Sequence, residues 1–279
     1  MLVSNKKSAL YLKSYFKQIG LTQIVICPGS RNLPLIVNFS NDPDFKVYSI
    51  IDERVAGFFA LGLAKASRKP TAVITTSGSA ALNLAPAMVE AYYQRLPLLA
   101  ITADRPEERI EKGENQTIVQ KGLFTNYVSY EMELEEKISF NLFEKNIQSL
   151  HQFLFQSPNS GNVHINLPFS EPLDSVEYLL GKFKFNLNQK KAPLKSVLNS
   201  IIPFQKGQNV IIYLSSFHED LQLNQLLEDG VLNKNWVVIS ELHSGWKHKN
   251  LISQIDLILS GDRIVHKPDI LITIGETML

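Results

Sequence analysis

One stretch of the sequence, residues 71–104, reads TAVITTSGSAALNLAPAMVEAYYQRLPLLAITAD. Its two apolar runs, Thr71–Thr75 and Leu98–Thr102, are short and uncharged, which is typical of strands buried on both faces. Between them, Ala80–Gln94 is rich in small and apolar residues and is long enough for a crossover helix. A strand, a helix and a second strand at this spacing predict a βαβ unit with parallel strands.

The same alternation continues on both sides of this unit. Further strands are predicted at Gln23–Cys27, Lys46–Ile50 and Val163–Leu167, and further helices at Pro34–Ser40, Arg54–Ala66 and Phe140–Gln156. The first twenty residues carry apolar side chains at helical spacing, and Gly20 stands where a helix would end. The pattern predicts an α/β fold, with a parallel sheet covered by helices on both faces.

A second α/β series follows a lysine- and asparagine-bearing stretch. We predict a first domain at 1–182, a linker at 183–196 and a second domain at 197–279. The second series has predicted strands at Asn209–Leu214, Trp236–Glu241 and Ile270–Ile274, and helices at Asp220–Leu227 and Lys249–Ser260. Three strands with two crossovers make half of a doubly wound domain. We therefore expect an incomplete central domain and an N-terminal fragment of a longer enzyme.

Composition excludes several kinds of partner. The 279 residues carry 28 basic and 27 acidic side chains, a net charge of +1, without a basic stripe. Nucleic acid and anionic membrane surfaces are therefore poor candidates. The single cysteine, Cys27, excludes an internal disulfide and fits a reducing compartment. No stretch approaches the roughly 20 apolar residues of a membrane span, and lysines interrupt the N-terminal apolar positions, so we predict a cytoplasmic protein.

Polar clusters follow the predicted parallel strands, at the sheet edge where ligands bind in open α/β folds. These clusters are Pro28–Arg31, Asp52–Arg54, Thr76–Ala81 and Asp104–Pro106, and the loop Gly113–Thr117 comes later. Each one alone is more readily explained as a turn, a helix cap or an exposed loop. Their shared position at one edge of one sheet instead favours a ligand site.

Four segments also carry a resemblance to a known family: CPGSR (27–31), DERVAGFFALGLAKA (52–66), TTSGSAALNLAPAMVEAYYQRLPLLAITADRP (75–106) and GENQTI (113–118). In this order they resemble the N-terminal region of the 2-succinyl-5-enolpyruvyl-6-hydroxy-3-cyclohexene-1-carboxylate (SEPHCHC) synthase family. These are thiamin-diphosphate-dependent enzymes of menaquinone biosynthesis. The departures are small: Cys27 stands where serine is common, Asn32-Leu33 where Ser-Thr is frequent, and Ser79 where threonine is.

The resemblance implies thiamin diphosphate with Mg²⁺ as cofactor. The cofactor must lose a proton from its thiazolium C2, and its aminopyrimidine assists when a carboxylic acid binds the ring nitrogen. That catalytic role is implied for Glu53, with burial against the apolar segment Val55–Ala64 favouring proton sharing. The implied cofactor-binding residues are Pro28, Gly29, Glu53, Thr76, Ser77, Gly78 and Ser79.

The implied substrates are 2-oxoglutarate and isochorismate, both dicarboxylates. Their carboxylates require cationic, fork-shaped partners, which Arg31 and Arg105 supply. Ser30, Asn115 and Gln116 are implied to fix the orientation of the substrates. The family also implies a homo-oligomer, a dimer or tetramer, since its cofactor lies between domains of two subunits.

Metal ligands are not predicted within this chain. The family's Gly-Asp-Gly element, which holds magnesium and diphosphate, does not occur, and Gly261-Asp262-Arg263 lacks the second glycine. The six histidines show no zinc spacing. Two alternatives stay open: another thiamin-diphosphate carboligase or decarboxylase, and a non-catalytic α/β binding module. The two arginines favour the synthase, because a small 2-keto acid would not require both.

Overall fold

The computed structural model describes residues 2–67, 69–157, 160–178, 183–187, 208–215, 221–233, 236–241, 246, 251–252 and 267–275. The chain divides into two compact units, Met1–Ala192 and Pro193–Leu279. The predicted domain end at 182 and the linker residues 188–196 lie outside the described residues, so these boundaries stay predictions.

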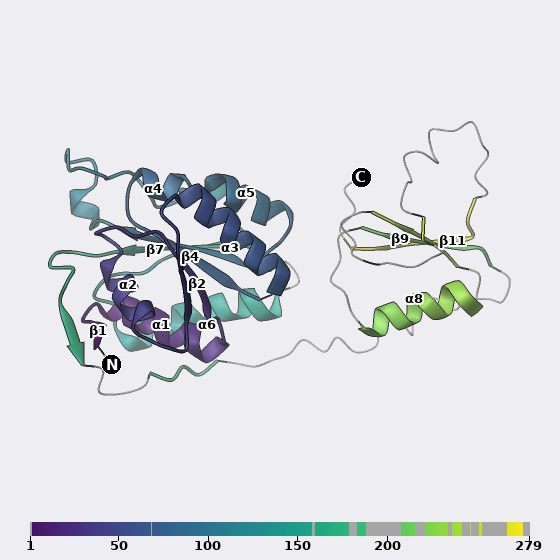
Figure 1. Cartoon of the computed structure of the whole chain (residues 1–279), viewed down its shortest axis with the longest axis horizontal. Coiled ribbons are helices and arrows are strands. Elements are labelled where there is room, and N and C mark those ends of the chain that lie inside the picture. The colour runs from purple at the N-terminus through teal and green to yellow at the C-terminus, as the bar shows by residue number, and fades with distance from the viewer. Residues whose placement is uncertain are drawn as a thin grey trace. The chain divides into compact units, whose positions relative to one another are not determined.

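A six-stranded parallel sheet forms the centre of the first unit (Figure 1). Its strands are β2 (Gln23–Ile26), β3 (Lys46–Ser49), β4 (Thr71–Thr75), β5 (Leu98–Asp104), β6 (Tyr130–Glu133) and β7 (Val163–Pro168). They lie in the order β3-β2-β4-β5-β7-β6, and every neighbouring pair is parallel. Every residue of β4 and β5 is buried, as expected of strands covered on both faces. The predicted fold class is confirmed.

Helices cover both faces of this sheet, as Figure 1 shows. One layer contains α1 (Lys7–Ile19), α2 (Leu33–Ser40) and α6 (Phe140–Gln156), and the other contains α3 (Glu53–Ser67), α4 (Ser79–Leu82) and α5 (Ala85–Tyr93). Each layer has its own apolar core, one rich in phenylalanine and the other rich in alanine. The small side chains of Ala56, Ala60 and Ala87 are fully buried and bring α3 and α5 close together. As predicted, α1 ends before Gly20.

Three local features differ from the prediction. The single helix expected at Ala80–Gln94 is divided into α4 and α5, because Pro86 lacks an N–H and occupies the first turn of α5. Strand β6 was not predicted, since its sequence YEME is short and half polar. A two-stranded antiparallel pair, β1 (Leu2–Ser4) with β8 (Val176–Tyr178), was also missed.

The second unit has a three-stranded parallel sheet in the order β10-β9-β11. Its elements are β9 (Val210–Leu214), α8 (Leu221–Asn233), β10 (Val237–Ser240) and β11 (Ile270–Ile274). Helix α8 continues past the predicted end at Leu227. The predicted helix Lys249–Ser260 lies mostly outside the described residues, but Ile252 forms a parallel bridge with Ile239 and is therefore not helical.

Candidate cofactor and substrate site

The four polar clusters meet at one edge of the sheet, as predicted. Strands β2, β3, β4 and β5 are parallel neighbours, so the segments that follow them lie at the same carboxyl edge. An open hollow of about 620 Å³ lies here. Pro28, Gly29 and Ser30 line one part of it, and residues 171–174 line another. This edge is the candidate site.

Gly29 makes room for Thr76. A Cβ at Gly29 would lie 2.5 Å from the Cβ of Thr76, a distance that no real side chain tolerates. The backbone N–H of Arg31 donates to the Thr76 hydroxyl at 3.2 Å, and Thr76 is buried. The glycine therefore allows the β2 and β4 loops to pack together, whatever ligand lies above them.

The turn after β4 is held by the later loop. Gly78 has φ +82°, and a Cβ there would lie 2.8 Å from Cγ of Gln116. The Ser77 hydroxyl donates to the backbone carbonyl of Gln116 at 3.1 Å, and the Gly78 N–H donates to Oε1 of Gln120 at 2.8 Å. Ser79 is exposed at the start of α4. The loop 113–120 thus fixes the Ser77-Gly78 turn.

Gln120 was missed by the sequence reasoning, although it connects the two halves of this edge. It is fully buried, and its Nε2 donates to the Ala103 carbonyl at 3.2 Å and to Oδ1 of Asn166 at 2.9 Å. Asn166 then donates through Nδ2 to Asp104 at 2.9 Å. Burial raises the pKa of Asp104, although the hydrogen bonds from Asn166 and from the Arg105 N–H oppose this shift. The sequence signal available was the presence of two polar residues, His164 and Asn166, in the predicted strand Val163–Leu167.

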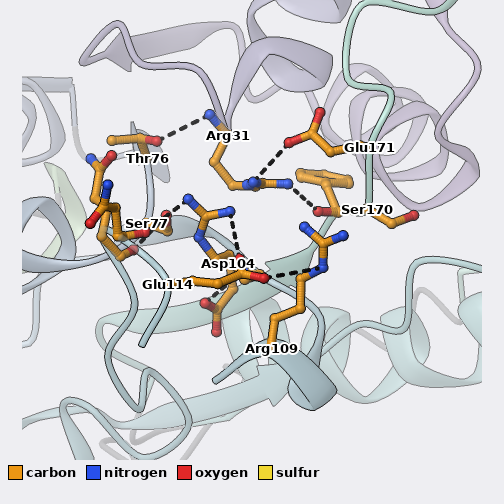
Figure 2. A network of polar contacts seen from close by, with 12 residues as sticks. Arg31, Thr76, Ser77, Asp104, Arg109, Glu114, Ser170 and Glu171 are labelled. Atoms are coloured by element: carbon orange, nitrogen blue, oxygen red, sulfur yellow. Dashed lines mark hydrogen bonds and ion pairs between the residues drawn. The ribbon is translucent and has the colours of Figure 1, made fainter. Parts of the chain in front are cut away.

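Arg31 is buried with its guanidinium group already paired (Figure 2). Its NH1 donates to the Phe169 carbonyl at 2.8 Å, and its NH2 forms an ion pair with Oε1 of Glu171 at 2.9 Å. Burial lowers the pKa of Arg31, and so does the charge of Arg105, while Glu171 raises it. The sequence did not single out Glu171.

Two further arginines share a second glutamate, as Figure 2 shows for Arg109 and Glu114. Glu114 lies 3.3 Å from NH1 of Arg105 and 3.6 Å from Nε of Arg109. The NH2 of Arg105 donates to the backbone carbonyl of Asn115 at 2.8 Å. The side chains of Asn115 and Gln116 are exposed, so in this structure these residues contribute backbone carbonyls. Arg109, unlike Arg105, was not predicted.

Glu53 begins α3 and is partly exposed. Its carboxylate makes no hydrogen bond or ion pair with any of the residues that the structure describes. The expected burial against Val55–Ala64 is not formed, because Val55 and Phe58 point outward and are 54% and 44% exposed. Glu53 nevertheless lies near Cys27, at the end of β2. The pKa of Cys27 is raised to about 12, mainly by burial and then by the charges of Glu53 and Asp52.

These residues fit the pyrimidine side of the implied cofactor. A partly exposed carboxyl group without a partner in the described structure is available to bind a ring nitrogen, and the hollow at Pro28–Ser30 lies at the same edge.

Within the described ranges, no cluster of three or more His, Cys, Asp or Glu side chains could bind a metal ion. Among those same residues, no helix has both the length and the apolar character to span a membrane.

Comparison with known proteins agrees with this geometry. Residues 7–123 match the model of the thiamine pyrophosphate enzyme N-terminal TPP-binding domain. The chain is 38% identical over 263 residues to the curated 2-succinyl-5-enolpyruvyl-6-hydroxy-3-cyclohexene-1-carboxylate synthase of Flavobacterium psychrophilum, covering 92% of this chain and 47% of that protein. Synthases with the same name from Flavobacterium johnsoniae and Porphyromonas gingivalis are 37% and 36% identical, over 92% and 99% of this chain and 47% and 49% of their own lengths.

The chain thus spans about half the length of the curated relatives it matches. The matched segment 7–123 contains β2 to β5 and therefore Gly29, Glu53, Gly78 and Arg105, whereas residues 171–174 of the hollow lie outside it. Residues 7–123 therefore match the N-terminal TPP-binding domain of the thiamine pyrophosphate enzymes, and the chain is similar over most of its length to about half of a SEPHCHC synthase.

Proposed function

We propose that this chain is the pyrimidine-binding part of a synthase that joins 2-oxoglutarate to isochorismate with loss of carbon dioxide, in menaquinone biosynthesis. The observation that carries the proposal is the pairing of two features at one sheet edge. One is the unpartnered carboxylate of Glu53, and the other is the group of guanidiniums from Arg31 and Arg105. The names of the relatives support the same choice of substrates.

Glu53 is the proposed catalytic residue of this chain. Its carboxylic acid would hold a ring nitrogen of the aminopyrimidine and share a proton with it. Thiamin diphosphate, when bound, supplies the nucleophilic carbon that accepts a 2-keto acid. The proposed residues around the pyrimidine are the backbone and side chains of Pro28, Gly29, Thr76, Ser77, Gly78 and Ser79. The Mg²⁺ and diphosphate ligands are assigned to protein outside residues 1–279.

The substrate side is assigned to Ser30, Arg31, Arg105, Asn115 and Gln116. Guanidinium groups bind carboxylates bidentately, and two dicarboxylate substrates require several such contacts. Asn115 and Gln116 have exposed side chains, which leaves their amides available to a substrate. We place the protein in the cytoplasm as a homo-oligomer, dimer or tetramer, because the family's cofactor binds between subunits.

The test is an assay of the complete protein that contains this chain. It would be supplied with thiamin diphosphate, Mg²⁺, 2-oxoglutarate and isochorismate, and carbon dioxide release would be followed together with the coupled product. Release that depends on isochorismate supports the proposal. Efficient turnover of pyruvate, without use of 2-oxoglutarate, would indicate a different carboligase. No turnover with any 2-keto acid would favour a non-catalytic binding module.

A further inference from the structure

The guanidinium of Arg31 is almost fully buried and already paired in this structure. The Arg31 side chain is 6% exposed, and its two terminal nitrogens are engaged by the Phe169 carbonyl and by Glu171. These contacts use two of the five guanidinium N–H donors. Because the side chain is almost fully buried, a carboxylate that arrives from the hollow would compete with Glu171 for the group. The question is therefore whether Glu171 is a fixed partner or an exchangeable one.

Glu171 has the features of an exchangeable partner. Its side chain is 54% exposed, in contrast to that of Arg31, and it lines the hollow next to Gly29 and Ser30. Among the described residues, it forms one ion pair, between its Oε1 and the Arg31 NH2 at 2.9 Å. An ion pair with one exposed member is weakened by water and salt, and little structure has to move when that member turns away.

The backbone that carries Glu171 is held by several contacts besides the one from Arg31 to the Phe169 carbonyl. The carboxylate of Glu136 accepts hydrogen bonds from the N–H and the hydroxyl of Ser170, at 3.1 and 2.6 Å. Lys6 donates to Glu136 at 2.6 Å and to the Ser170 carbonyl at 2.7 Å. The Phe169 N–H donates to the Asp104 carbonyl at 3.0 Å. The Glu171 side chain can therefore turn into solvent while the loop stays in place.

The neighbouring charges favour an anion at this position. Arg105 and Arg109 both act on Arg31 and lower its pKa, so the three cations repel one another. Their carboxylate partners are Glu171 and Glu114, and the contacts of Glu114 are long, 3.3 and 3.6 Å. Nε of Arg105 is buried without a hydrogen-bond partner in the described part of the chain. Asp104 and Asp174 also lie at this edge. An anion is therefore favoured by the repulsion among the three guanidiniums and by the unpartnered Nε of Arg105, not by a net positive charge.

We propose that Glu171 is a placeholder: it occupies the Arg31 guanidinium in the free protein and is displaced when a ligand carboxylate takes that position. The identity of the ligand as a dicarboxylate substrate rests on the proposed function, but the exchange itself concerns only Arg31 and Glu171. Glu171 is then a specificity-determining residue. A ligand must carry a carboxylate that competes with it, and neutral analogues are rejected.

The proposal predicts that removal of the placeholder charge tightens carboxylate binding. Glu171→Gln keeps the shape of the side chain but competes for Arg31 only as a neutral acceptor. Because the displaced ion pair is half exposed, we expect the dissociation constant for a carboxylate to fall about three- to tenfold. Glu171→Ala, which removes the contact completely, should act in the same direction. A structural partner would show the opposite, since its loss would disorder Arg31 and weaken binding.

Succinate is a suitable probe because it is a dicarboxylate that lacks a keto group and requires no cofactor. The ¹⁵N- and ¹³C-labelled 279-residue chain is titrated with succinate at constant ionic strength, and the Arg31 Nε–Hε and Glu171 side-chain carboxyl signals are followed by NMR. In the wild type both signals should move together as Glu171 is released. Succinamide, the neutral analogue, should move neither signal.

Glu177 provides the matched control, as an exposed glutamate in β8. Glu177→Gln should leave the succinate dissociation constant unchanged, while Glu171→Gln lowers it. Equal or weaker succinate binding by Glu171→Gln, or no succinate-dependent shift at Arg31 in that variant, overturns the proposal. If the 279-residue chain binds succinate in this way but the complete protein lacks synthase activity, the proposed function alone is contradicted. An active synthase whose Glu171 signal never moves contradicts the placeholder alone.

Discussion

The backbone N–H of Gly78 donates a hydrogen bond to the buried side chain of Gln120, 2.8 Å away, and so connects the turn after β4 to the loop that follows β5. Nε2 of the Gln120 side chain donates to the Ala103 carbonyl and to Oδ1 of Asn166. One side chain thus sets the position of the glycine turn relative to the strand that carries Asp104. Loss of the Gln120 side chain should therefore lower the stability of the first unit.

Gln120→Leu should destabilise the first unit by about 2–4 kcal/mol, because it removes the partner of the buried Gly78 N–H and the side-chain contact of the Ala103 carbonyl, while Asn166 Oδ1 keeps only its bond from Thr102. Urea unfolding followed by circular dichroism measures the change. Asn115→Ala, at an exposed side chain of the same loop, is the control and should change stability by less than about 0.5 kcal/mol. Equal effects of the two variants would contradict the role given to Gln120.

Glu53→Gln should reduce turnover of the complete enzyme by several powers of ten while cofactor binding persists. Glutamine keeps the size and shape of the side chain but cannot share a proton with the pyrimidine nitrogen. Hydrogen–deuterium exchange at the cofactor C2 measures the affected step directly. An unchanged exchange rate would remove Glu53 from the catalytic role.

Cys27 should be unreactive toward iodoacetamide at pH 8. Its pKa of about 12 leaves very little thiolate, whereas an unfolded thiol with a pKa of about 8.5 reacts readily. Modification should therefore follow unfolding, and urea should accelerate it strongly. The raised pKa also means that the stability contribution of the protonated thiol is complete below about pH 8.5 and is lost as pH rises toward 12.

The double variant Asp52→Asn, Glu53→Gln isolates the electrostatic part of this shift. Both carboxylates raise the pKa of Cys27, so their removal should lower it and increase the alkylation rate at pH 9–10. Burial is the larger cause, so most of the protection should remain. A rate equal to that of the unfolded chain would show that Cys27 is not buried in solution.

Arg31→Ala and Arg105→Ala should act mainly on the use of isochorismate by the complete enzyme. Loss of a charge-assisted hydrogen bond costs roughly 1.5–3 kcal/mol, which corresponds to about a ten- to a hundredfold weakening. Lysine at either position should rescue only part of the loss, because an ammonium group lacks the fork. Normal Michaelis constants for both substrates in steady-state kinetics would exclude the substrate-binding role.

The 279-residue chain alone should bind thiamin diphosphate and magnesium negligibly. Most of the binding free energy is expected from the magnesium-bridged diphosphate, which carries the charge. The described residues include no acidic cluster for the metal, and pyrimidine contacts must still offset the entropy of association. Calorimetric titration measures this. Stoichiometric binding with a dissociation constant near micromolar would place the diphosphate site within these residues.

The sheet was predictable because its strands are apolar runs that have to be buried, as the complete burial of β4 and β5 illustrates. Parallel order then brings the strand ends together, so the positions of Gly29, Glu53, Gly78 and Arg105 followed from sequence. Pro86 was the sequence signal for the division of the predicted helix Ala80–Gln94. Whether this proline divides the helix depends, however, on the local geometry of the turn.

The partners of the site residues could not be predicted in the same way. Gln120 and Asn166 are 46 positions apart, and Arg31 and Phe169 are 138 apart, so no local pattern connects them. The partial exposure of Glu53 was missed for a different reason. An apolar helix such as α3 predicts burial, but Val55 and Phe58 lie on its outward face.

The first residues of the chain have a consequence for how the protein is handled. Strand β1 pairs with β8, Asn5 donates to Ser175, and Lys6 fixes Ser170, so five consecutive residues anchor the segment that carries Glu171. Chain termini are commonly treated as free positions for affinity tags and trimming. Here removal of residues 2–6 would take away these contacts and loosen the wall of the ligand hollow.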